Sequence, residues 1–340
     1  MKYTKTLLSI VVGLGWTAFT FGQIGLNKLA QSTMNFQLVG VSPKASAMGE
    51  AFFTAGVGAE SMFYNPAGLA VSPNRFEAIL NYTQWIGDVN YLCGAVTCNL
   101  GPIGVLGLSL LSVDYGTIYG TQLDPSPSSP DGFIEIGELS NIGATSAGLS
   151  YARAINANFS MGGSVRVAAQ NLGSNTFVDG TIRKNNAAKL VFDAGVRYDT
   201  HYRGFAFGMA IRNFSSNVKR EEISEQMPLT FTMGAAVDLW DLAAESDRHD
   251  LLFAVDFLHS NSYSERIHMG AEYLFMGMLA LRAGYQTNRD IASWSAGIGF
   301  ITALQGCDVE INYAFSKMEL FDDVNRFSVR FGFPGRAAAK

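Results

Sequence analysis

The residues that most often carry catalysis are few and widely spaced in this 340-residue chain. Asp308 and Glu310 form an i, i+2 pair of carboxylates on one face of a strand, which a glycosidase could use, but the wall of a sheet explains the pair more simply. No glycine-rich phosphate loop follows a strand, and no HxH or HExxH spacing occurs among the histidines: His201, His249, His259 and His268. The sequence therefore predicts no catalytic residue, no metal ligand and no cofactor site.

Charged residues show a clearer pattern, because many of them share one phase of an alternating sequence. The opposite phase is apolar or aromatic. If the charged phase faces the inside of a barrel, its mixture of signs predicts a network of paired charges in the lumen. Such a network could brace and hydrate the wall, or it could contact a substrate. The residues in this phase are Arg166, Asp193, Arg197, Asp238, Asp256, Arg266, Glu272, Arg282, Asp308, Glu310, Arg326 and Arg330.

The elements that would position these charges are long strands. From about residue 75 onward the sequence alternates with a period of two, as where Phe159, Met161 and Val165 alternate with Ser160 and Ser164. Most segments are longer than the roughly five or six residues of a soluble strand and match the ~9–11 tilted residues that cross a bilayer. We predict about fourteen strands, near 75–85, 89–99, 103–114, 143–155, 158–171, 188–199, 203–214, 227–239, 249–258, 264–275, 277–286, 291–302, 307–316 and 324–333.

Alternation alone does not distinguish a membrane barrel from a soluble one. Side chains fill a closed barrel only up to about eight strands, so a soluble barrel of this size is excluded, although a soluble two-sheet sandwich is not. The connections favour a membrane barrel, because short turns at one rim and long loops at the other are typical of outer-membrane proteins. The short connections are 99–102, 156–157, 200–202 and 275–276, and the long ones are 115–142, 172–187 and 215–226; 87–88 and 240–248 are exceptions. We therefore predict an all-β transmembrane antiparallel barrel over 75–333, in contact with outer-membrane lipid.

The composition agrees with a lipid-facing surface. Charged residues make up 16% of the chain and 48% is hydrophobic, with 36 glycines, whereas an ordinary soluble domain has about 25% charged residues. A net charge of −5 without a basic cluster argues against a nucleic-acid partner. This hydrophobicity also excludes intrinsic disorder.

The chain begins with a sequence typical of export. Lys2 and Lys5 precede an apolar run over 7–21, and Thr20-Phe21-Gly22 places small residues at the usual cleavage positions, so we expect a secretory signal peptide over 1–22. An N-terminal membrane anchor is the alternative, but the run is shorter than the ~20 residues of a spanning helix. At the other end, residues 334–340 would form a short C-terminal tail after Phe333.

Residues 23–74 do not alternate and precede the first strand. They predict a short helix around 26–32, a loop, and a run of small residues over 45–58. About fifty residues are too few for a second domain with its own core, but a wide barrel offers a lumen to fill. The segment is therefore predicted to be a hatch or plug; the alternative is a simple loop that leads into the first strand, with a turn at Asn65 and Pro66.

Two motifs in this segment resemble the start of the PorV/PorQ family of FadL-like outer-membrane proteins. They are KASAMGEAF at 44–52 and SMFYNPAGL at 61–69. Shorter matches are NYTQW at 81–85, LGPIG at 100–104, LSYAR at 149–153, GAEY at 270–273 and LRAGY at 281–285. The hatch motif comprises Met48, Gly49, Asn65, Pro66, Ala67 and Gly68.

The resemblance implies a fourteen-stranded barrel in the cell outer membrane, with the N-terminal segment as a hatch in the lumen. It implies a non-enzymatic role in type IX protein secretion, where such proteins bind the C-terminal domains of cargo near the translocon. Better-known FadL relatives take up long-chain fatty acids and other hydrophobic small molecules, which is the alternative function. A purely structural or adhesive barrel is a third. The resemblance departs at the C-terminus, since such barrels commonly end at an aromatic residue, and at the loop over 115–142, which does not align.

Overall fold

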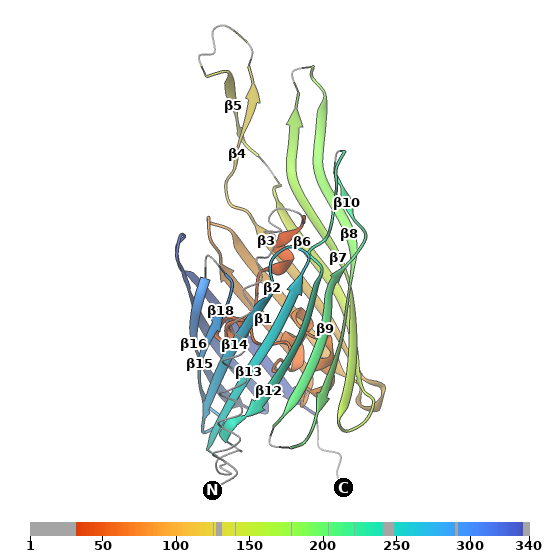
Figure 1. The fold of residues 1–340 in the computed structure, drawn as a ribbon, viewed down its shortest axis with the longest axis vertical. Coiled ribbons are helices and arrows are strands. Elements are labelled where there is room, and N and C mark those ends of the chain that lie inside the picture. The colour runs from red at the N-terminus through yellow and green to blue at the C-terminus, as the bar shows by residue number, and fades with distance from the viewer. Residues whose placement is uncertain are drawn as a thin grey trace.

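The computed structural model describes residues 32–124, 126, 131–139, 141–177, 179–202, 204–220, 222–240, 248–289 and 292–335. The signal peptide expected over 1–22 and nearly all of the helix expected around 26–32 lie outside the described residues. Residues 336–340 of the expected tail and most of the 240–248 connection lie outside them as well. The described chain is a barrel with an N-terminal segment inside it (Figure 1).

The described residues form a closed antiparallel β-barrel of fourteen strands, which confirms the predicted fold. Each barrel strand pairs with its neighbours along the chain, and the first pairs with the last, with Tyr82 opposite Phe327. All the predicted strands have counterparts: β1 (Asn74–Gln84), β2 (Asn90–Asn99), β3 (Val105–Asp114), β6 (Gly143–Ala154), β7 (Phe159–Thr176), β8 (Ile182–Asp199), β9 (Ala206–Phe214), β12 (Thr230–Asp238), β13 (His249–Ser260), β14 (Arg266–Phe275), β15 (Leu279–Gln286), β16 (Ala292–Leu304), β17 (Cys307–Met318) and β18 (Val324–Pro334).

The long connections hold additional strands. The loop over 115–142 contains a hairpin of β4 (Tyr119–Leu123) and β5 (Phe133–Glu138), which stands beyond the barrel in Figure 1. A second small sheet joins β10 (Val218–Lys219) to β11 (Ser224–Glu225). The short 100–104 turn at the opposite rim contains the 3₁₀ helix η4 (Gly101–Ile103).

The prediction of a long loop over 172–187 is wrong, because most of these residues belong to strands. β7 continues to Thr176 and β8 begins at Ile182, so both strands extend past the rim of the barrel (Figure 1). The first residues of β8 are exposed on both faces. A strand with water on both sides has no apolar face, so its sequence does not alternate between apolar and polar residues. The alternation therefore stops before the ends of β7 and β8, and the sequence could not show that the strands continue.

The outer face of the barrel is apolar and uncovered. In β3, Leu108 is 58% exposed and Leu110 is 57% exposed, whereas the inward Val113 of the same strand is 3% exposed. A soluble sandwich would bury such a continuous apolar surface, while a membrane barrel presents it to lipid. The protein is therefore an outer-membrane β-barrel, with the long loops at one rim and the short turns at the other.

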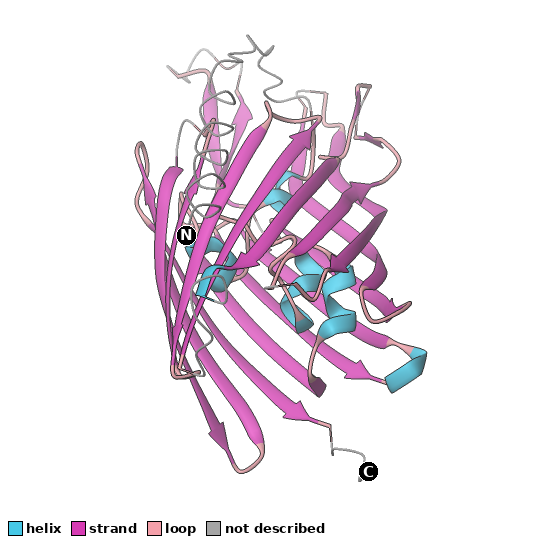
Figure 2. Ribbon diagram, turned by 60° about the horizontal axis from the view of Figure 1, so that its bottom comes forward, coloured by secondary structure: helices cyan, strands magenta, loops and turns pink. Residues whose placement is uncertain are grey.

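The N-terminal segment, residues 32–73, lies within the barrel (Figure 2). It consists of short helices and turns: η1 (Asn35–Leu38), α2 (Pro43–Ala47), η2 (Gly58–Phe63) and η3 (Pro66–Val71). The helix α2 contacts β15, β16 and β17, while η2 contacts β1 to β3 and η3 contacts β6 to β8. The segment thus touches opposite sides of the wall. No helix in the described part of the chain is long and apolar enough to cross a membrane.

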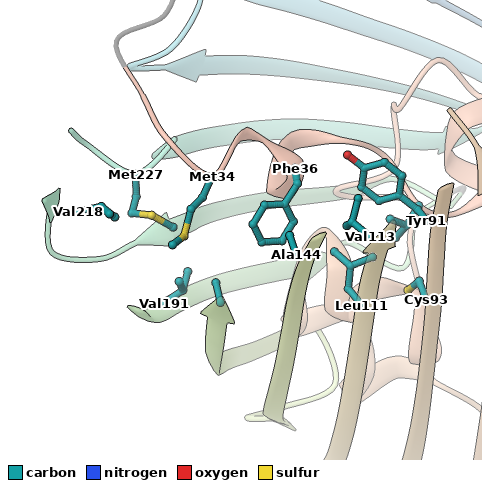
Figure 3. Close-up of a cluster of buried hydrophobic side chains, with 12 residues drawn as sticks. Met34, Phe36, Tyr91, Cys93, Leu111, Val113, Ala144, Val191, Val218 and Met227 are labelled. Atoms are coloured by element: carbon teal, nitrogen blue, oxygen red, sulfur yellow. The ribbon is translucent and has the colours of Figure 1, made fainter. Parts of the chain in front are cut away.

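Met34 and Phe36 anchor the start of the segment on an apolar patch of the inner wall (Figure 3). The wall side of the patch lies toward the long-loop rim. It comprises inward residues of the barrel strands: Tyr91, Cys93, Leu111, Val113, Ala144, Ala168 and Val191. Val218 of β10 and Met227, which follows β11, complete the patch, and each of these residues is no more than 6% exposed. The lumen is therefore partly apolar, although the alternating pattern predicted a small or charged inner phase.

Glycines on the inner wall allow the segment to approach the strands closely. A Cβ atom on Gly162 of β7 would lie 2.6 Å from the carbonyl oxygen of Pro66, and one on Gly284 of β15 would overlap the backbone of Met48 and Gly49. Real Cβ atoms do not make such contacts, because interiors are close-packed without overlap. At these positions glycine is required by packing.

Candidate functional site in the barrel lumen

Five charged side chains form what we term the Arg282 cluster: Lys44, Glu272, Arg282, Glu310 and Arg330. Arg282 Nε binds Glu272 Oε2, and Arg282 Nη2 lies 3.2 Å from Glu310 Oε1. Arg330 Nη2 lies 2.8 Å from Glu310 Oε2, and Lys44 Nζ lies 3.4 Å from Glu272 Oε2. The Arg282 side chain is 1% exposed, so its two ion pairs are shielded from water, while Lys44 and Arg330 are about one-fifth exposed. Removing one partner of such a pair leaves a buried charge.

The barrel register explains why distant residues meet in this cluster. Arg282 is on β15 and Glu310 is on β17, with β16 between them. A Cβ atom on Gly299 of β16 would lie 2.6 Å from Arg282 Nη1. Because glycine has no side chain, the guanidinium can extend across β16 to reach Glu310. Arg282 Nη1 also donates to Asn312 Oδ1 at 2.7 Å. Lys44 belongs to α2, so the cluster ties the N-terminal segment to the wall.

Glu60 is a buried carboxyl of η2 beside this cluster. Its side chain accepts a hydrogen bond from Ser42 Oγ at 3.1 Å, and the residue is 5% exposed. Burial raises the pKa of Glu60 to about 7, and repulsion by Glu310 adds to the rise. Its protonation state therefore changes near neutral pH.

A second group, the Arg166 cluster, contains Gln37, Arg166, Asp193 and Asn213. Arg166 Nε and Nη2 donate to the two oxygens of Asp193 at 2.8 and 2.9 Å, a bidentate pair. Arg166 Nη1 donates to Gln37 Oε1 at 2.5 Å. Asn213 accepts from Arg166 Nη2 at 2.8 Å. This cluster joins β7, β8 and β9 to the N-terminal segment.

Two more of the predicted inward charges hold the segment directly. Arg197 Nη1 donates to the carbonyl oxygen of Thr54, and its Nη2 lies 2.8 Å from Asp199 Oδ1. Asp256 is fully buried and accepts the backbone N–H of Phe53 at 2.9 Å.

The other predicted charges lie at strand ends or at a cavity. Asp238 accepts the backbone N–H of Trp240 at 2.8 Å, and Asp308 lies partly exposed near the start of β17. Arg266 and Arg326 line the cavity described next. The structure thus divides the twelve predicted charges among two clusters, the segment contacts, a rim and a cavity.

A cavity of about 450 Å³ lies between the N-terminal segment and the long-loop end of the lumen. We term it the arginine cavity, because five arginines and one carboxylate, Glu50, contribute to its lining. The remaining lining includes apolar side chains: Leu38, Val41, Phe53, Phe63, Trp85, Leu111 and Leu258. The arginines are Arg166, Arg212, Arg266, Arg289 and Arg326.

Arg212 and Arg289 are cavity residues that sequence reasoning missed. Arg212 has the same parity in β9 as the inward Gly208 and Ala210, so alternation could have found it. Arg289 lies in the connection after β15, where no periodicity exists to read. The Arg212 guanidinium carbon lies 5.7 Å from the ring centroid of Phe53 and 5.8 Å from that of Tyr64, within the usual range of a cation–π contact.

The hatch-motif residues all belong to the buried part of the N-terminal segment. Asn65 is the N-cap of η3: its Oδ1 accepts the N–H of Ala67 at 3.1 Å, and its Nδ2 donates to the Val196 carbonyl of β8 at 3.1 Å. Pro66 occupies the first turn of η3, where its missing N–H costs nothing.

The rest of the motif packs against the wall or within the segment. Met48 and Ala67 are fully buried. The N–H of Gly49 donates to Ser295 Oγ at 3.2 Å, and Gly49 has a φ of +63°, which disfavours other residues. A Cβ atom on Gly68 would overlap the carbonyl oxygen of Gly56.

The histidines occupy separate places. His201 contacts the Ala157 carbonyl, His249 contacts Tyr273, and His259 contacts Glu265; His268 is buried at the cavity. Among the described residues no group of three His, Cys, Asp or Glu side chains is placed to hold a metal ion.

Three solved structures are similar to this fold. The CymD monoaromatic hydrocarbon channel superposes with a TM-score of 0.58 at 12% identity, covering 89% of this chain and 99% of its own. The Pseudomonas putida toluene transporter TodX gives a TM-score of 0.57 at 12% identity, over 86% of this chain and 97% of its own. A Pseudomonas aeruginosa FadL homologue gives 0.53 at 13% identity, over 87% and 99%. No protein-family model and no curated protein matches the sequence.

Proposed function

We propose that this protein is an outer-membrane channel for hydrophobic small molecules, with the N-terminal segment as a hatch that controls the lumen. The observation that carries the proposal is the arginine cavity, which lies inside the barrel and has an apolar wall. Binding sites for small molecules are concave, mostly apolar, and have a few placed polar groups. The shared fold with two hydrocarbon channels and a FadL homologue supports the same function.

Uptake by intact cells tests the channel. Cells that express the protein should take up a radiolabelled monoaromatic hydrocarbon faster than cells without it. Leu258→Trp adds bulk at the cavity wall and should reduce uptake, while Leu108→Trp changes only a lipid-facing side chain and should not. Equal uptake with and without the protein would overturn the proposal.

The hatch is supported by the hydrogen bonds of Asn65, which cap η3 and join it to β8. Asn65→Ala removes both, so the segment should loosen and the conductance in planar bilayers should rise. Asn99→Ala is the matched control, because Asn99 only accepts the Gly101 N–H in an exposed turn. Unchanged conductance in Asn65→Ala would argue against a hatch and leave the barrel unaffected.

Protein secretion of the PorV/PorQ type is a second candidate, and the β4–β5 hairpin favours it. The hairpin exposes large apolar residues in water, including Tyr119 at 65% and Leu123 at 70%. Exposed apolar patches of this kind mark protein contacts. Pull-down of the intact protein from detergent extracts should recover translocon components or cargo C-terminal domains. Recovery of neither would exclude this candidate.

A further inference from the structure

The arginine cavity has more positive charge than an uncharged hydrocarbon needs. Arg166 is neutralised by Asp193. Arg212, Arg289 and Arg326 line the same cavity with Glu50 as its only described carboxylate. These three guanidinium groups therefore exceed the lining carboxylate by two charges, without counting Arg266.

The donors of these arginines are only partly used. Each guanidinium carries five N–H groups. Arg289 donates to Gln286, and Arg326 donates to the Gly40 carbonyl at 3.2 Å and to Ser316 Oγ at 2.7 Å. Arg212 lies over two aromatic rings and is attracted to Asp193, whose two oxygens already accept hydrogen bonds from Arg166. Because the hydrogen-bond acceptors of Arg289 and Arg326 and the aromatic rings are uncharged, they do not neutralise the positive charges of the arginines.

Glu50 is itself committed to neighbours in the N-terminal segment. Its Oε1 accepts from Ser46 Oγ, and its Oε2 accepts from Tyr64 Oη at 2.9 Å. Burial of Arg289 lowers its pKa, while attraction to Glu50 acts in the opposite direction. The cavity thus holds cations at a desolvation cost that an anionic guest would offset.

We propose that the arginine cavity binds an amphiphile whose head group carries two negative charges, as a phosphate monoester does, and whose chain packs on the apolar wall. This inference rests on the proposed channel function and narrows its substrate class. Guanidinium groups match phosphate oxygens in geometry and bind them bidentately. The apolar lining, including Phe63, Trp85 and Leu258, offers surface for the chain.

Three probes with the same chain separate the head group from the chain. They are dodecyl phosphate, dodecanoate and dodecanol, which share one alkyl chain. Each is titrated at pH 8 into the full-length protein in zwitterionic nanodiscs, and the signal from nanodiscs without protein is subtracted. At this pH a phosphate monoester carries close to two charges. Dodecyl phosphate should bind about tenfold tighter than dodecanoate, as expected for one further charge-assisted contact, and dodecanol should bind weakest. Equal affinities for the three probes would overturn the proposal.

Inorganic phosphate distinguishes a free ion from a lipid-like ligand. It should bind much more weakly than dodecyl phosphate, because it leaves the apolar wall uncovered. If it binds as tightly, the site takes a free ion and the amphiphile is wrong.

Variants locate the site. Arg212→Gln should weaken dodecyl phosphate about tenfold and leave dodecanol unchanged. Arg289→Gln, in a connection outside the strands, should act in the same way and serves if the first variant does not fold. Arg153→Gln changes an exposed arginine at the short-turn end of β6 and should have no effect. Unchanged affinity in both cavity variants would overturn the assignment, while protein-dependent hydrocarbon uptake would still support the channel.

Discussion

Arg282 Nη2 and Glu310 Oε1 lie 3.2 Å apart although their strands are not neighbours in the sheet. Arg282 also binds Glu272 on β14, so one guanidinium joins the strands on both sides of it. The pairing depends on Gly299, whose missing side chain leaves the crossing open. The buried charges therefore act as a brace between β14 and β17.

Arg282→Gln should destabilise the barrel. It removes the most buried cation of the cluster, after which Glu272 keeps Lys44 and Glu310 keeps Arg330 as partners. Removal of one partner from a buried pair costs about 3–5 kcal/mol, and the remaining partners should hold the loss near the lower end of that range. Urea unfolding in micelles, followed by the gel mobility of unheated samples, measures the change. Arg153→Gln should stay within about 0.5 kcal/mol. Adding Glu310→Gln to Arg282→Gln should restore part of the loss, and a loss equal to the control would contradict the brace.

Gly284→Ala should displace the N-terminal segment from β15. The new Cβ atom would overlap the backbone of Met48 and Gly49, and backbone cannot yield as a flexible side chain can. Limited proteolysis of the folded protein should then cleave within 32–73. Gly94→Ala is the control, because its Cβ atom would meet only ordinary contacts at 3.6 Å or more. If both variants resist cleavage equally, the close approach at Gly284 does not hold the segment.

Alternation predicted the fold and the inward phase because it reports which side of a strand meets lipid. It could not predict which charges pair, since that depends on the register and on glycines such as Gly299 that open paths between strands. Lys44 was missed as a cluster member because its segment has no period of two. The apolar patch at Tyr91 and Val113 was unexpected because inward apolar residues are stabilised by Met34 and Phe36, which lie far away in sequence.

Glu60 should make stability depend on pH. Its pKa is about 7 in the folded protein and about 4.5 when unfolded, so between these values the folded state binds the extra proton. Stability is therefore highest below about pH 4.5 as far as this group is concerned, and falls as pH rises to about 7. The full difference is about 3 kcal/mol. Urea midpoints at pH 5 and pH 8 should differ more in the wild type than in Glu60→Gln, which remains neutral. Equal pH dependence in the two proteins would place the titration elsewhere.

Arginine substitutions at two depths test how the barrel sits in the membrane. Leu110 is a lipid-facing residue in the middle of β3 and is 57% exposed, while Ile103 is 66% exposed in the short turn before it. Arginine costs about 2–4 kcal/mol at the bilayer midplane and about 0–1 kcal/mol near the interface. Leu110→Arg should thus lower the unfolding free energy in lipid vesicles by several times more than Ile103→Arg. In a soluble protein both positions would face water, and arginine would cost about the same at each. Similar costs for the two variants would therefore mean that β3 does not cross the membrane.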